Sequence, residues 1–120
     1  MAILTDTNYV DKAEKTIKSL GKNRKGEFYL STSQLRNILN LSSSLYDEAR
    51  YKDYADLEDR IAYLKVRIVY AAGRESAVKE LVYNGDLLKI IDEIEDKESL
   101  IRFCHYMEAL VAYLKFYGGE

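Results

Sequence analysis

No proline interrupts this chain, and its six glycines are confined to positions 21, 26, 73, 85, 118 and 119. Proline breaks a helix interior by removing a hydrogen-bond donor and by a steric clash, and glycine weakens a helix through its backbone freedom. The long segments between the glycines are therefore free to form helices. Within them, apolar residues recur at steps of three and four, the period of an amphipathic helix. The sequence predicts an all-α fold.

Length and composition indicate one folded unit. A chain of 120 residues matches a single domain and is long enough to bury about two thirds of its unfolded surface. Apolar residues make up 48% of it and charged residues 32%, a balance typical of folded domains rather than of disordered chains. We expect a single domain over residues 1–120, built as a compact bundle of five to six helices.

Capping residues and glycines give the expected helix bounds. Asp6 or Thr7 should cap the first helix, Ser31 or Thr32 the second, and the serines at 42–44 could bend or split that second helix. The last helix carries an apolar arc of roughly half its circumference, which should lie between other helices or face a partner. The expected helices are 8–20, a second from 32 through the serine run, 54–72 behind Asp53, 75–83, 86–94, and 97–117 behind Asp96.

The third helix carries a row of arginines and tyrosines, which we call the arginine–tyrosine row: Arg60, Tyr63, Arg67, Tyr70 and Arg74. At about 100° per residue, these side chains fall within roughly one quadrant of the helix, beside an apolar stripe. The arginines of the row stand roughly 10 Å apart along the axis. Planar guanidinium groups match phosphate oxygens, and the phenol rings can stack or donate hydrogen bonds. A polyanionic backbone would suit such a row.

Two alternatives stay open for the basic residues. The row could be a solvated face whose arginines pair with Asp56, Glu58 and Asp59, as surface charges often do. The chain could also be a helical adaptor that bridges proteins without touching nucleic acid. Arg50 and Lys52 precede the third helix and could extend its charge, whereas Lys65 lies beyond the apolar stripe. The lysine-rich loop at 22–25 is as simply explained by solubility.

Charge and cysteine content bound the cellular context. Net charge is −2, but residues 1–74 carry +3 and residues 75–120 carry −5, which favours one basic and one acidic face. The single Cys104 forms no disulfide within the chain. No charged and then apolar leader opens the sequence, and no run of 18 uncharged apolar residues occurs. We expect a cytoplasmic protein without membrane contact.

The residues needed for catalysis or metal binding are poorly represented. The chain has no glycine-rich phosphate loop, no nucleophile elbow, and no pair of cysteines or histidines at metal spacing. Cys104 should be a packed, inert thiol, and His105 a surface or structural histidine. Acids at 92–98 surround a turn between helices, where solvated carboxylates and a cap by Asp96 are expected. We predict no enzyme activity, no metal and no cofactor.

Several segments resemble a known family along the whole chain. LKVRIVYAAGR at 64–74 resembles the tyrosine–alanine–glycine–arginine signature of the small subunit of the type III-A CRISPR (Csm) effector complex. YMEALVAYLKFYGG at 106–119 is similar to that family's ending, and MAILTDTNYVDKAEK at 1–15 to its streptococcal-type opening. QLRNIL at 34–39 also matches, behind the Ser/Thr cap. These segments follow one another in the same order and with the same spacing as in that family.

The resemblance implies an all-helical, non-catalytic subunit of an antiviral ribonucleoprotein. Several copies would stack along the guide RNA–target RNA duplex and contact mainly the target strand's backbone through basic side chains. The other partners implied are neighbouring copies of the chain, the backbone subunits and the large subunit. The matching positions are Arg36, Lys65, Arg67 and Arg74. Helical geometry alone adds Arg50, Lys52 and Arg60 to these RNA-binding candidates.

Overall fold

The computed structural model describes residues 3–119, so residues 1, 2 and 120 of the predicted domain lie outside the described residues. Six α-helices and one short 3-10 turn form the described chain, in agreement with the all-α prediction. Their bounds are α1 Tyr9–Ser19, α2 Thr32–Glu48, η1 Tyr54–Asp56, α3 Glu58–Arg74, α4 Ser76–Asn84, α5 Leu87–Asp92 and α6 Lys97–Phe116.

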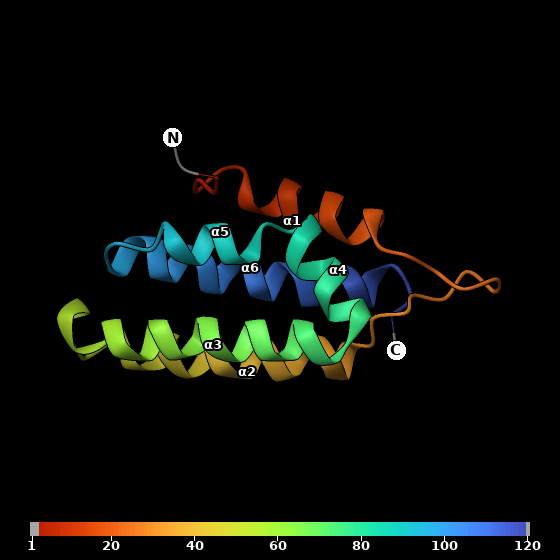
Figure 1. Cartoon of the computed structure of the whole chain (residues 1–120). Coiled ribbons are helices and arrows are strands. Elements are labelled where there is room, and N and C mark those ends of the chain that lie inside the picture. The colour runs from red at the N-terminus through yellow and green to blue at the C-terminus, as the bar shows by residue number, and fades with distance from the viewer. Residues whose placement is uncertain (1–2, 120) are drawn as a thin grey trace.

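The helices pack in layers around α6 (Figure 1). Helix α1 covers one side of α6 and α2 covers another, while α3 packs against α2, α4 and α5. Helices α2 and α3 lie side by side along the lower edge in Figure 1, away from α1. The molecule is elongated, with extents of 47 × 30 × 23 Å. Two long helices, α2 and α3, therefore form one flank of the molecule.

The wide apolar arc of the last helix is buried between other helices, as expected. Residues Leu100, Phe103, Tyr106, Met107, Leu110 and Leu114 are fully buried. The hydroxyl of Tyr106 donates a hydrogen bond of 2.9 Å to the Gly85 carbonyl oxygen. Burial raises the pKa of this tyrosine to about 12, so the buried phenol stays neutral. Helix α6 is the centre of the core.

Two predicted helix caps are confirmed. Ser31 and Gln34 form a reciprocal capping box at the start of α2, and Asp96 and Ser99 form another at the start of α6. In each box, side chains satisfy backbone N–H groups that the first turn leaves without partners. These local signals fix where both helices begin.

Other predicted boundaries are wrong in detail. The N-cap of α1 is Asn8 rather than Asp6 or Thr7, and Asp53 precedes the 3-10 turn rather than α3 itself. Helix α3 also continues through Gly73 to Arg74. The serine run does not break α2, because the Ser42 hydroxyl is buried and donates 2.9 Å to the Leu39 carbonyl oxygen. The Ser42 hydroxyl thus finds its partner within the same helix, which continues to Glu48.

Cys104 and His105 are both held by packing. The Cys104 thiol is buried, donates 3.3 Å to the Ser42 carbonyl oxygen, and has its pKa raised to about 12 by burial. This confirms the predicted packed thiol. His105 is half-buried between the rings of Tyr9 and Tyr46, with centroid distances of 6.0 and 5.8 Å. It is a structural histidine, as predicted.

No helix within residues 3–119 combines the length and apolar character that crossing a membrane requires. Over the same range, no group of three or more His, Cys, Asp or Glu side chains is arranged to hold a metal ion.

Candidate nucleic-acid interface

The arginine–tyrosine row lies on the outward flank of α3, along its seam with α2. Arg67 and Arg74 are exposed, and Tyr63 and Tyr70 keep 56% and 57% of their surface exposed. The Arg74 guanidinium lies 5.8 Å from the centroid of the Tyr70 ring. Within the described residues, neither Arg67 nor Arg74 forms an ion pair with an acid. Two positive charges, about 10 Å apart by the helical rise, are therefore free for an external anion.

Arg60, the first arginine of the row, is neutralised instead. Its guanidinium forms an ion pair of 2.5 Å with Glu48 of α2 and donates 3.3 Å to the Ser44 hydroxyl. The Lys52 ammonium reaches the same carboxylate at 2.7 Å. The predicted partners were Asp56, Glu58 and Asp59 near the start of α3, but the acid that Arg60 meets comes from the neighbouring helix. Packing leaves Glu48 only 8% exposed, so its charge requires nearby cations.

The charge of Glu48 predicts how the stability of the fold depends on pH. Its hydrogen bond from Lys52, and then the charge of Arg60, hold the pKa of this carboxyl below its usual range. Glu48 therefore binds a proton more readily in the unfolded chain than in the folded one. Its ionised carboxylate stabilises the fold in full above about pH 4.5, and this stabilisation is lost as the pH falls through the pKa of Glu48 in the folded chain. We expect Glu48→Gln to lower the urea midpoint at pH 7 and to have a smaller effect at pH 3.

Asp59→Asn is the matched control for this experiment, because Asp59 is exposed and forms no ion pair with another described residue. It should change the urea midpoint little at either pH. An effect of Glu48→Gln that is equal at pH 7 and pH 3 would show that lost packing, and not lost charge, is responsible.

The remaining basic candidates divide between paired and unpaired side chains. Lys65 lies on the other flank of α3 and forms an ion pair of 2.6 Å with Asp92, which ends α5. Arg36 in α2 and Arg50 just after it are exposed and form no ion pair within residues 3–119. Of the seven predicted RNA-binding side chains, the structure therefore leaves these unpaired: Arg36, Arg50, Arg67 and Arg74.

A row of uncharged polar side chains on α2 was missed by the sequence analysis, which used only the apolar side of this helix. We call it the α2 polar row: Ser33, Asn37, Asn40 and Ser44, all exposed. Their spacing of four, three and four places them on one helix face. The spacing was visible in the sequence, but which neighbour that face adjoins was not.

Two contacts fix how the two rows adjoin. Ser44 meets Arg60 at one end of the seam, and Gln34 hydrogen-bonds Glu75 at the other. The helices therefore pack together in antiparallel directions, and Figure 1 shows these directions. Asn37 lies seven residues before Ser44 in α2, and Arg67 lies seven residues after Arg60 in α3. Because the two helices are antiparallel, Asn37 lies level with Arg67. We call the surface that carries both rows the α2–α3 face.

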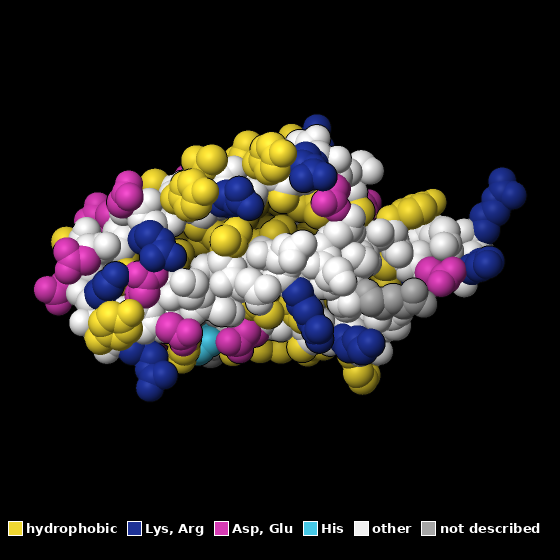
Figure 2. All heavy atoms as spheres, turned by 90° about the horizontal axis from the view of Figure 1, so that it is seen from below, with side chains coloured by type: hydrophobic (Ala, Val, Ile, Leu, Met, Phe, Trp, Pro, Cys, Tyr) yellow, Lys and Arg dark blue, Asp and Glu magenta, His cyan; other side chains and the backbone are white. Residues whose placement is uncertain are grey.

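Figure 2 looks onto this side of the molecule. A broad uncharged area occupies its centre, with cationic and acidic groups toward the margins and hydrophobic side chains gathered along one edge. The large exposed apolar side chains of α3 are Tyr63, Val66, Val69 and Tyr70, of which Tyr63 and Tyr70 belong to this face. The face thus offers free guanidinium groups, neutral hydrogen-bonding groups and apolar surface together.

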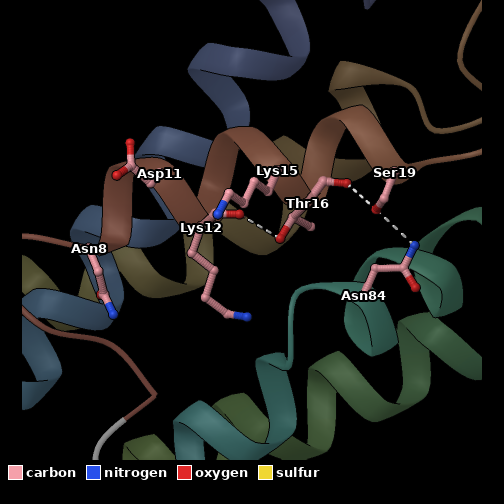
Figure 3. A pocket seen from close by; sticks show the side chains of 7 residues that line it. All are labelled: Asn8, Asp11, Lys12, Lys15, Thr16, Ser19 and Asn84. Carbon is pink, nitrogen blue, oxygen red and sulfur yellow. Dashed lines mark hydrogen bonds between the residues drawn. The ribbon is translucent and has the colours of Figure 1, made fainter.

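A hollow of about 620 Å³ lies elsewhere, between α1 and α4 (Figure 3). Several of its polar groups are engaged within the chain. The Ser19 hydroxyl accepts 3.1 Å from Asn84 and donates 2.6 Å to the Thr16 carbonyl oxygen, and Lys12 pairs with Asp86 at 2.9 Å. This hollow is a weaker candidate for a binding site than the α2–α3 face.

Comparison with known proteins identifies the family. The family model described as Csm2 Type III-A matches residues 6–120. The chain belongs to the type III-A Csm2 family. A relative from Streptococcus thermophilus, named CRISPR system Cms protein Csm2, is 55% identical over all of this chain and 99% of its own length. Csm2 proteins of the same name from Mycobacterium tuberculosis strain CDC 1551 / Oshkosh and Enterococcus italicus are 44% and 33% identical. These alignments cover 97% and 95% of this chain and 95% and 90% of the relatives.

Family membership confirms the resemblance found in the sequence. The similarity to Csm2 relatives covers nearly the whole length of each chain, so it concerns the complete helical bundle and not one motif. The α2–α3 face is consequently a feature of a CRISPR-system protein.

Proposed function

We propose that this chain is a non-catalytic small subunit of a type III-A CRISPR RNA-guided complex and contacts the backbone of the target RNA strand through its α2–α3 face. The observation that carries the proposal is the pair Arg67 and Arg74, exposed on one flank and unpaired within the described chain. Arg36 in α2 and Arg50 just after it are likewise exposed and unpaired within residues 3–119, and would add charge from α2.

The physical demands of the task fit this surface. In a guide–target duplex, base pairing carries the sequence information, so a protein subunit needs only phosphate and shape contacts. A few arginines per chain give weak, salt-sensitive binding. Several copies along one RNA would multiply that affinity through avidity.

Stacking of copies, and contacts with the backbone and large subunits, belong to the same proposal. Exposed apolar groups support it, since Val66 and Val69 on α3 and Phe116 at the end of α6 are 59%, 48% and 76% exposed. The same observation favours the second candidate, a protein adaptor whose arginines never touch RNA. The two functions differ in one measurable property, which is contact with the target strand.

Photo-crosslinking separates them. The assembled complex would be bound to a complementary target RNA carrying photoreactive nucleotides along the guide-paired region. We expect this chain to acquire label at α2 or α3 peptides, in a ladder of positions if several copies stack. Labelling of the other subunits without this chain would refute RNA contact and leave the adaptor function.

A further inference from the structure

We propose that the α2 polar row hydrogen-bonds the ribose 2′-hydroxyl groups of the strand whose phosphates meet Arg67 and Arg74, and that the α2–α3 face thereby selects RNA over DNA. This inference rests on the proposed function and adds the chemical class of the ligand. The residues assigned to sugar recognition are Asn37 and Asn40, with Ser33 and Ser44 at the ends of the row.

The first support is a long uncharged stretch within α2. Residues 37–46 contain no Asp, Glu, Lys or Arg, in a chain that is 32% charged. Exposed helix positions are usually filled by strong helix formers such as Lys, Glu or Ala, and Asn and Ser are poorer choices. Their recurrence on one exposed face is not explained by helix stability or by burial.

The second support is that these amides are free. Asn37 and Asn40 are exposed and form no side-chain hydrogen bond with another described residue. Within the α2 polar row, the Ser44 hydroxyl accepts a hydrogen bond from Arg60. An asparagine amide both donates and accepts, which matches a hydroxyl group that does the same.

The third support is position. Asn37 lies level with Arg67 across the seam, one helix over, and packed helices stand roughly 8–10 Å apart. An RNA duplex has a wide, shallow minor groove that displays 2′-hydroxyls next to the phosphates. Laid on the α2–α3 face, such a groove would bring phosphates to α3 and sugars to α2. Uncharged amides would approach the sugars without repelling the phosphates.

The test compares two target strands of one sequence, all-ribose and fully 2′-deoxy, bound to the assembled complex. The ratio of their affinities is measured for the wild type and for Asn37→Ala/Asn40→Ala in every copy. We expect the double variant to lose affinity for the ribose strand, by about twofold to tenfold per hydrogen bond removed, and to keep its affinity for the deoxy strand. The ratio should therefore fall.

Two further variants make the result decisive. Arg67→Ala should weaken both strands equally, because both carry phosphates, and Asn84→Ala, an asparagine outside the row, should change neither. If Asn37→Ala/Asn40→Ala leaves the ratio unchanged while Arg67→Ala weakens binding, sugar recognition is refuted and the proposed function stands. If Arg67→Ala also has no effect, the proposed function fails with it. Alanine is the better helix former, so unchanged helical content is expected in every variant.

Discussion

Phe103→Ala should lower the free energy of unfolding by about 3–5 kcal/mol. The Phe103 ring is fully buried in α6, the helix that α1 and α2 both cover. Its removal loses the transfer free energy of the ring and leaves a cavity that rigid neighbouring helices fill only in part. Domains of this size are stable by about 5–15 kcal/mol, so the variant would lose a large share of its stability. Urea unfolding followed by circular dichroism measures the change.

Phe116→Ala is the matched control, because it is the same substitution in the same helix at a side chain that is 76% exposed. It should shift the free energy of unfolding by about 0.5 kcal/mol or less. Similar losses in the two variants would contradict the position of α6 at the centre of the core.

The double variant Arg67→Ala/Arg74→Ala should weaken binding of target RNA to the assembled complex by about tenfold or more at low salt, since two charge-assisted contacts are removed. The plot of log affinity against log salt should become less steep, because fewer counterions are released when fewer phosphates are neutralised. Filter binding over a series of salt concentrations measures both effects. Helical content should not change, as both side chains are exposed.

Lys15→Ala/Lys18→Ala provides the control for charge alone. These two exposed lysines lie on α1, away from the α2–α3 face in Figure 1, and their removal lowers the net charge by the same amount. We expect little change in affinity and slope. If the two double variants behave alike, the arginines act only through overall charge, and no specific contact at α3 is needed.

Local patterns were sufficient for the fold class and for several helix starts. The capping residues Ser31 and Asp96 act through hydrogen bonds within one turn, so the sequence contains all the information that they use. The start of α3 was harder to predict, because Asp53 precedes a 3-10 turn at Tyr54–Asp56 and the long helix starts only at Glu58. Whether the chain forms a 3-10 turn or an α-helix after Asp53 depends on several residues together. A capping residue alone does not distinguish the two.

The candidate site shows where the sequence was insufficient. Helical periodicity correctly placed Arg60, Arg67 and Arg74 on one flank of α3, because that depends only on the 3.6-residue repeat. The same periodicity could not identify Glu48 as the partner of Arg60, since that ion pair joins α3 to α2. For the same reason it gave no partner for Lys65, whose acid is on α5.

By itself, therefore, the sequence determined the helical class, the side of each long helix that is apolar, and the family, since all of these are carried by residue order and spacing. Only the tertiary structure decided which cations remain available and that the α2 polar row lies beside them. The reason is physical: the charge of an arginine is neutralised by whatever acid the packing of helices brings within reach, and helix packing joins residues that are distant in the chain.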